Sequence, residues 1–233
     1  MQLMADTVTP HLSRRASDAA FEYLRDAIVN LELAPGSALS DRELSDKLQM
    51  SRTPIREALL RLTELGLVEI RPQAGTRVSK IRMTEVLEAH FIRRELEGAC
   101  AREAARVITE VQRSELLFLM DQQKLDHCAQ NVRLFSRLDH EFHGAIHSIA
   151  GNRMCRVIIR DARMFMDRLR NLSLYEATAR PEIIAEHSVI ATALVSGDPD
   201  AAKLAMDRHM DRVQGVAKKL VAQYPEFFEK SGA

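Results

Sequence analysis

The spacing of apolar residues in the first third of the chain predicts three helices. Apolar positions recur every three or four residues from Ala16 onward, and Pro35-Gly36 ends this first helix with a turn. Ser40–Glu43 forms an S-x-x-E capping box that opens a short second helix. Thr53-Pro54 opens the third helix, because proline in the first helical turn sacrifices no hydrogen bond. Residues 1–15 lack this periodicity, and we expect a flexible tail there.

After the third helix the pattern changes to that of two short strands. Residues 67–70 and 76–79 have a strand-like composition, and 71–75 between them form a plausible hairpin tip that ends in glycine. Helices joined by a tight turn and followed by a hairpin are typical of a winged helix-turn-helix. We therefore predict such a DNA-binding domain over residues 16–80.

From Met83 onward the pattern is helical almost throughout. Gly151-Asn152 and Gly197-Asp198-Pro199 interrupt it, the latter with an aspartate N-cap followed by proline. The sequence thus predicts a mainly α protein, with an all-α helical bundle over 83–229 and a domain boundary near 79–83. The expected helices are 83–107, 110–128, 131–150, 152–172, 179–196 and 199–223.

Composition narrows the class of protein. The 233 residues carry no net charge, so any contact with nucleic acid must come from a local basic patch. No apolar stretch approaches the ~20 residues of a membrane helix, and the N-terminus lacks the apolar core of a signal peptide. We therefore expect a cytoplasmic protein that does not enter a membrane. The three cysteines form no CxxC pair, so neither a disulfide framework nor a cysteine zinc site is indicated.

The start of the third helix has side chains suited to reading DNA. Arg52 and Arg56 lie one helical turn apart, and arginine pairs bidentately with guanine in the major groove. Ser51 and Thr53 are short hydrogen-bond donors beside a helix N-terminus, which attracts phosphate. Taken singly, each arginine is more often a solvated surface charge than a base contact. Their order together with the capping box, the turn and the hairpin favours DNA binding.

The hairpin supplies a second set of candidate contacts. Arg71 and Arg77 flank its tip, and Gly75 would let the backbone approach a minor groove. The hairpin would then serve as the wing of the DNA-binding domain.

The N-terminal segment LAPGSALSDRELSDKLQMSRTPIREALLRLTELGLVEIRPQAGTRV resembles the GntR superfamily of bacterial regulators. The all-helical remainder resembles the FadR-type branch, whose effector domain is called FCD, and the resemblance spans about residues 16–223. It implies a homodimeric transcription factor on a palindromic operator, with repression the commoner behaviour. Carried over by position, it implies that five residues face DNA: Arg42, Arg52, Thr53, Arg56 and Gly75.

Histidines in the helical region are candidate metal ligands. Asp139, His143 and His147 follow one stripe of a helix at i, i+4 and i+8, and His187 and His209 lie on two later helices. Three helices of a bundle can converge on one ion. The FadR-type branch includes members that bind a metal through one aspartate and three histidines, which here implies Asp139, His143, His187 and His209. His147 is then an outer-shell partner or a substitute ligand.

The implied site leaves the ion and the effector open. Four ligands complete a tetrahedral zinc site, whereas an octahedral ion such as nickel or manganese keeps two positions for a small carboxylate effector. Arg93 matches the arginine that often faces this pocket, and guanidinium suits a carboxylate. The alternative to this effector-binding role is that Arg93 forms an ordinary i, i+4 ion pair with Glu97 on a helix surface.

Two other functions compete with the ligand-responsive regulator. In a dedicated metal sensor the ion itself is the signal. In a metalloenzyme a metal-bound water needs a general base, and Glu141 and Glu186 neighbour the implied ligands in sequence. Adjacent helical residues point about 100° apart, and an enzyme would leave the N-terminal module unexplained. We therefore predict that the protein is not an enzyme.

Overall fold

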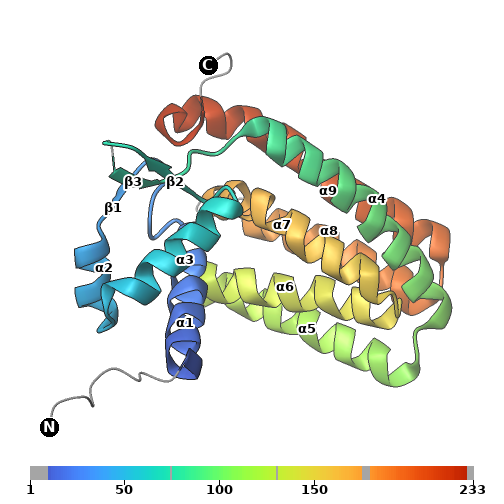
Figure 1. Cartoon of the computed structure of the whole chain (residues 1–233). Helices are drawn as coiled ribbons and strands as arrows, with labels where there is room; N and C mark the ends of the chain where they lie inside the picture. The colour runs from blue at the N-terminus through green and yellow to red at the C-terminus, as the bar shows by residue number, and fades with distance from the viewer. Residues whose placement is uncertain (1–9, 74, 130, 175–178, 230–233) are drawn as a thin grey trace, which may run out of the picture. The chain divides into compact units, whose positions relative to one another are not determined.

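The computed structural model describes residues 10–73, 75–129, 131–174 and 179–229. The described residues divide into two compact units (Figure 1), one formed by those between 10 and 80 with 226–229 and the other by those between 81 and 225. Among the described residues, no helix is both long and apolar enough to cross a membrane.

The first unit is a small helical domain with a three-stranded antiparallel sheet, ordered β1-β3-β2. Strands β2 and β3 form the expected hairpin, in register from Val68 opposite Val78 to Arg71 opposite Gly75. Buried side chains such as Leu24, Ile55 and Leu59 fill the space between α1 and α3. The elements are α1 (Pro10–Val29), β1 (Ala38–Leu39), α2 (Asp41–Leu48), α3 (Arg52–Glu64), β2 (Val68–Arg71) and β3 (Gly75–Val78).

Two details of this unit differ from the sequence prediction. Helix α1 begins at Pro10, so residues 10–15, expected in a tail, are helical. Proline is accommodated at a helix start, and the polar residues that follow it give no apolar periodicity to detect. Strand β1 has only two residues, too few for an alternating pattern, and it forms by pairing with β3.

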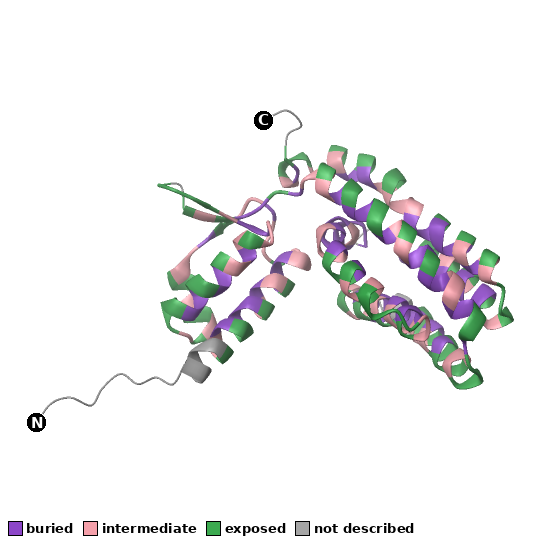
Figure 2. Cartoon of the chain, turned by 45° about the vertical axis from the view of Figure 1, so that its right-hand side comes forward, coloured by how far each residue is buried: buried purple, intermediate pink, exposed green. Residues whose placement is uncertain are grey.

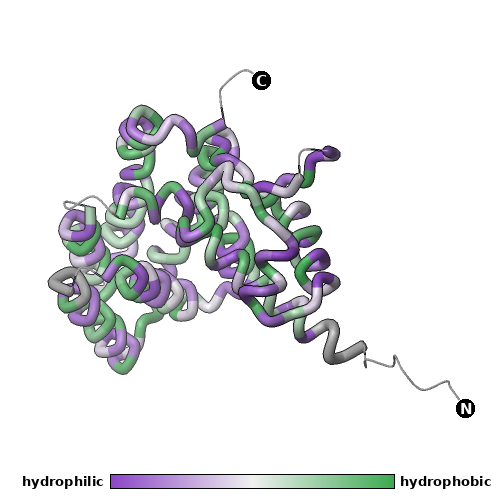
Figure 3. The backbone as a smooth tube through the Cα atoms, turned by 90° about the vertical axis from the view of Figure 1, so that its left-hand side faces the viewer, coloured by the Kyte–Doolittle hydropathy of each residue, from purple (hydrophilic) through white to green (hydrophobic). Residues whose placement is uncertain are grey.

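The second unit is the expected all-α bundle, with each helix beginning and ending within two residues of its predicted span. Figure 2 shows buried faces turned inward along these helices and exposed faces outward, and Figure 3 shows hydrophobic and hydrophilic positions interspersed along the same segments. The helices are α4 (Met83–Val107), α5 (Glu110–Ala129), α6 (Val132–Ile149), α7 (Arg153–Ser173), α8 (Ala179–Ser196) and α9 (Pro199–Gln223), followed by the short 3-10 helix η1 (Pro225–Phe227).

Helices α4 and α9 run side by side in the bundle (Figure 1). They approach closely because Gly98 lacks a side chain, since a Cβ there would lie 2.3 Å from Asp207 Oδ1. Small buried residues of α4, such as Ala101 and Ala104, pack with Phe142, Ile146, Leu194 and Met206 from three other helices in the core. This packing brings α4, α6, α8 and α9 together, and these helices carry the candidate metal ligands.

The C-terminal end of the chain differs from the expected domain span of 83–229. The described residues 226–229 cluster with the first unit, and Phe228 is buried. The segment leaves the bundle because α9 ends before Pro225, which lacks the N–H needed to continue the helix ladder.

Candidate metal centre and DNA-binding surface

The residues expected to face DNA lie on the surface of the first unit. Arg42, Arg52 and Arg56 are exposed on α2 and α3, as are the side chains of Ser51 and Thr53. Ser51 is the N-cap residue of α3, and its hydroxyl makes no capping hydrogen bond. Both that hydroxyl and the first backbone N–H groups of α3 are therefore available to a phosphate.

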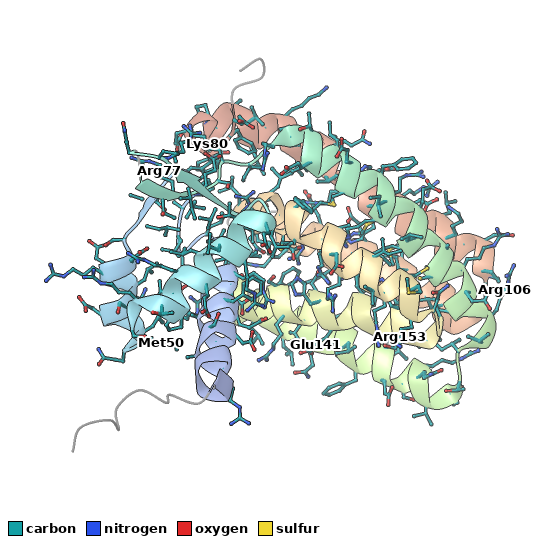
Figure 4. The ribbon with its side chains drawn as sticks, viewed as in Figure 1. Met50, Arg77, Lys80, Arg106, Glu141 and Arg153 are labelled. Carbon is teal, nitrogen blue, oxygen red and sulfur yellow. The ribbon has the colours of Figure 1, made fainter. Side chains whose placement is uncertain are left out.

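Arg56 has an ion-pair partner within the unit. Its Nε donates to Asp41 Oδ2 at 2.7 Å, which ties the start of α2 to α3. The Arg56 side chain is nevertheless 65% exposed, so its Nη groups can still reach a base edge. Met50, labelled in Figure 4, lies in the turn between these helices, where Gln49 takes the left-handed conformation at φ 54°.

The wing has the geometry expected of its tip. Gly75 is exposed with φ +82°, a conformation that residues with a Cβ rarely adopt. Arg77, labelled in Figure 4, is exposed on β3, and Arg71 ends β2. The described wing thus presents two arginines beside a glycine backbone.

Three buried histidines from three helices lie together in the second unit. His143 on α6, His187 on α8 and His209 on α9 offer nitrogen atoms within 4.8 Å of one another. The Nε2 atoms of His187 and His209 are 3.3 Å apart. Asp139 Oδ1 lies 3.6 Å from His187 Nε2. The packing therefore brings together all four residues of the expected metal set.

Each of these histidines has an acceptor facing its Nδ1 atom. His143 Nδ1 lies 2.6 Å from Glu97 Oε2, and His209 Nδ1 lies 2.7 Å from Glu186 Oε2. His187 Nδ1 lies 2.8 Å from Gln123 Oε1, whose Nε2 donates to a backbone carbonyl and so fixes the amide orientation. A proton on Nδ1 of each ring would satisfy these acceptors and leave the Nε2 atoms as potential metal ligands.

This pattern favours a cation among the three rings. With both rings protonated on Nδ1, the Nε2 atoms of His187 and His209, 3.3 Å apart, would both be acceptors, and a metal ion could bind both. Ligating histidines commonly donate their other ring N–H to a carboxylate or carbonyl, the arrangement seen here with Glu97, Gln123 and Glu186. The donor set fits a divalent ion.

The protonation states agree with metal-ligand chemistry. The pKa of His187 lies well below its ordinary value, chiefly because of burial and then because His209 is close. Burial by itself would raise the pKa of Asp139, but nearby positive charge, that of Arg170 first, holds it below its usual range. A neutral imidazole and an ionised carboxylate are the forms that bind metals.

Asp139 uses its two oxygens differently. Oδ2 is paired with Arg170 Nη2 at 2.9 Å and with Arg163 Nη2 at 3.2 Å. Oδ1 is the oxygen that faces His187. The arginines therefore orient the carboxylate and leave one oxygen as the ligand.

Glu97 is fully buried and connects the histidines to Arg93. Its Oε1 accepts from Arg93 Nε at 2.9 Å, and its Oε2 also lies 3.1 Å from His147 Nε2. Glu97, His143 and His147 form a second group close enough to hold an ion, and within it Glu97 Oε2 lies 2.6 Å from His143 Nδ1 and 3.1 Å from His147 Nε2. His147 therefore lies outside the three converging histidines, as an outer-shell partner would.

Arg93 pairs with Glu97 and also lines a cavity, so both interpretations of this arginine from the sequence apply, except that the pair is not on the surface. It does pair with Glu97 at i+4, but the pair is buried, with Arg93 3% exposed and Glu97 0% exposed, rather than on a helix surface. Arg93 also lines a cavity of about 70 Å³ together with Asp139, His143 and His209. The guanidinium thus lies between a buried carboxylate and an open space beside the candidate metal centre.

Comparison with known proteins identifies the family. Residues 16–78 match the model of the gntR family of bacterial regulatory proteins, and residues 85–212 match the FCD domain. The chain belongs to the GntR family, in its FadR-type branch with an FCD domain. It is therefore a DNA-binding transcriptional regulator and not an enzyme.

Relatives of this family cover nearly the whole chain. The transcriptional repressor RspR of Escherichia coli K12 is 33% identical over 210 residues, 90% of this chain and 92% of RspR. The Uxu operon transcriptional regulator of the same strain is 28% identical, over 82% of each chain. The crystal structure of a GntR regulator from Rhodococcus sp. RHA1 shares the fold, with a TM-score of 0.75 and 21% identity over 88% of this chain and 98% of that one.

The competing metalloenzyme hypothesis also lacks support in the site. Glu141, labelled in Figure 4, is exposed and pairs with Arg137 at 3.6 Å. The carboxylate of Glu186 is hydrogen-bonded to His209 and Arg212. Neither of the two carboxylates suggested by sequence is placed as a general base.

Proposed function

We propose that this regulator is a repressor whose helical domain binds one divalent ion through Asp139, His143, His187 and His209. The convergence of three buried histidines from three helices, each with an acceptor facing its Nδ1 atom, is the observation that carries the metal. Zinc is the favoured ion for three imidazoles and a carboxylate, with nickel and manganese as alternatives. Repression is inferred from RspR, which is named a repressor. Because its target is bacterial DNA, we place the protein in the cytoplasm.

The effector in this proposal is a small organic acid that binds Arg93 beside the ion and, where the ion is octahedral nickel or manganese, also completes its coordination shell. The cavity beside the metal cluster is lined by Arg93, Arg170 and Arg212, which suit a carboxylate. A cavity with this lining favours an organic effector over a dedicated metal sensor. The test measures affinity for a DNA operator selected in vitro, with zinc alone and with zinc plus an acid. Release of DNA by zinc alone would support the metal sensor instead.

DNA binding is proposed to use the exposed side chains at the start of α3 together with the wing. Arg52 and Arg56 would contact bases, while Ser51, Thr53 and Arg42 would contact phosphates. Gly75 would bring the wing backbone to the minor groove. Two copies of this surface in a homodimer would bind a palindromic operator.

The homodimer is proposed to form through α4 and α7. These helices pack together, and each exposes large apolar side chains one turn apart, Leu87 and Phe91 on α4 and Met154 and Ile158 on α7. Exposed apolar side chains that follow one another on a helix face are commonly covered by a partner. We expect Phe91→Glu to give a monomer at micromolar concentration, measured by light scattering, because a buried charge would face the partner.

The matched control is Phe118→Glu. Phe118 on α5 is 62% exposed, against 68% for Phe91, so both substitutions add a charge at a similar aromatic position. The control should remain a dimer. A monomeric wild-type protein, or dissociation by Phe118→Glu alone, contradicts an interface at α4 and α7.

A further inference from the structure

Helix α4 carries a cysteine on a buried stripe. Arg93, Glu97, Cys100 and Ala104 follow one another at intervals of three or four residues, and all four are buried. Helix α4 packs against α7 as well as against α9. A thiol on this stripe can therefore meet a side chain of α7.

Helix α7 carries a second cysteine on a stripe of the same kind. Cys155, Ile159, Ala162 and Met166 recur at intervals of three or four residues. The last three are buried, whereas Cys155, in the first turn of the helix, is partly exposed. Its backbone N–H donates to Asn152 Oδ1 at 3.1 Å, so a side-chain cap fixes the turn that holds this thiol.

The contacts between α4 and α7 show that the two helices are antiparallel. Arg93 Nη1 lies 3.9 Å from the Met166 sulfur. Nearer the start of α4, Glu85 interacts with Arg168, which lies further along α7. The α4 cysteine follows Arg93 by seven residues, about 10 Å of helix, and an equal length back along α7 from Met166 ends within one turn of the α7 cysteine. This register brings the two thiols to the same level of the bundle.

Cys100 and Cys155 interact there as free thiols. Burial first, and then the neighbouring Cys155 thiol, raises the pKa of Cys100 to about 12. The thiolate is the form of cysteine that attacks an oxidant, so Cys100 is a poor first nucleophile at neutral pH. Cys155 is the thiol that a small oxidant can reach, and Cys100 lies buried beside it.

We propose that Cys155 is an oxidation site for hydroperoxides and that Cys100 then completes a disulfide between α7 and α4. The Cys155 thiolate attacks a peroxide oxygen, the O–O bond breaks, and the departing oxygen takes a proton, which leaves a sulfenic acid on Cys155. The Cys100 sulfur attacks this sulfenic sulfur, the S–O bond breaks, and the thiol proton leaves with the hydroxyl group as water. One peroxide is thus reduced and two thiols are oxidised.

This inference uses neither the proposed metal ion nor the proposed effector. Disulfides formed in a reducing cytosol are usually transient and serve redox sensing, which suits a regulator. Cys100 follows Glu97 by one helical turn, and Glu97 faces His143. The bond would therefore fix α4 against α7 close to the candidate metal centre without using a candidate ligand.

The test adds hydrogen peroxide to the reduced full-length protein and follows it by thiol counting and mass spectrometry. We expect the thiols of Cys100 and Cys155 to be lost together, with each chain lighter by the mass of two hydrogen atoms. Peptide mapping should find these two cysteines joined to each other and not to Cys128. Dithiothreitol should restore both thiols, because a disulfide is reversed by thiol exchange.

Two single variants separate the roles of the cysteines. Cys100→Ala keeps the accessible thiol without its partner, so Cys155 should accumulate as a sulfenic acid that dimedone traps. Cys155→Ala keeps the buried thiol, and oxidation of Cys100 should be slower by at least about 10-fold.

Three results would overturn the inference. The first is a wild-type protein that keeps both thiols in peroxide, and the second is a disulfide that includes Cys128. The third is oxidation of Cys100 at an unchanged rate in Cys155→Ala. Mapping of the wild-type protein needs no substitution, so it decides the matter even where a variant is unstable.

Discussion

Replacing His187 with alanine is expected to abolish zinc binding, reducing the metal content of purified protein from about one ion per chain to a negligible level. His187 is fully buried, and its Nε2 lies close to both His209 and Asp139, so its loss leaves the site with three ligands and a gap. The ion binds only the folded state, so zinc at ~1,000 times its Kd should stabilise the wild type by about 4 kcal/mol. That corresponds to roughly 10 °C in Tm, and His187→Ala should lose this shift. Elemental analysis and thermal melting with and without chelator measure both effects.

His140→Ala is the matched control, because His140 lies on α6 beside Asp139 in sequence and its Nε2 faces Asp167 at 3.7 Å. The control should keep full metal content and the zinc-dependent shift. Basal DNA affinity should survive in His187→Ala, since His187 belongs to the second unit and the candidate DNA contacts to the first. A wild-type protein that holds no metal, and whose Tm is unmoved by added zinc, nickel or manganese, would show that these histidines serve another purpose.

Arg52→Ala and Arg56→Ala are each expected to weaken binding to the selected operator by about 5- to 150-fold. This range follows from the loss of one bidentate base contact, about 1–3 kcal/mol. Both side chains are exposed, so the fold should be unaffected and the melting curve of the free protein should change little. Gel-shift titration of each variant on operator and on unrelated DNA separates lost specificity from lost non-specific affinity.

Two controls isolate the base contact from other effects. Asp41→Asn breaks the ion pair with Arg56 while keeping the arginine, so it should retain operator affinity. Arg106→Ala removes an exposed positive charge at the end of α4, labelled in Figure 4, and should also bind normally. Unchanged affinity in both Arg52→Ala and Arg56→Ala would remove the start of α3 from the DNA interface.

The local elements of the fold could be predicted from the sequence because their signals are local. The spacing of apolar residues predicted both ends of each bundle helix to within two residues. Ser40 caps α2 by accepting a hydrogen bond from the Glu43 N–H, as the capping box predicts. The start of α1 and the short strand β1 were missed. In the first case the residues are polar, and in the second the strand exists only through its pairing with β3.

Sequence reasoning missed Gln123 and the contact of Glu97 with the histidines, although a signal was present. Glu97 precedes Ala101 and Ala104 by four and seven residues, and Gln123 follows Leu116 and Met120 by seven and three. Both polar residues therefore occupy the apolar stripe of a helix, and all six side chains are buried. A polar residue in a core stripe needs a buried partner, which here is the Nδ1 atom of a histidine.

The sequence by itself determined the two-part organisation, the helices, the exposed arginines of α3 and the pairing of Asp139 with His143 on one helical stripe. These depend on residues a few positions apart, whose relative geometry is fixed by the 3.6-residue repeat. Only the tertiary structure decided that His187 and His209 meet His143, that Arg93 and Glu97 are buried, and that a small cavity adjoins them. Those facts depend on how helices far apart in the chain pack against one another. Apolar spacing shows which face of a helix is buried, but it does not show which other helix packs against that face.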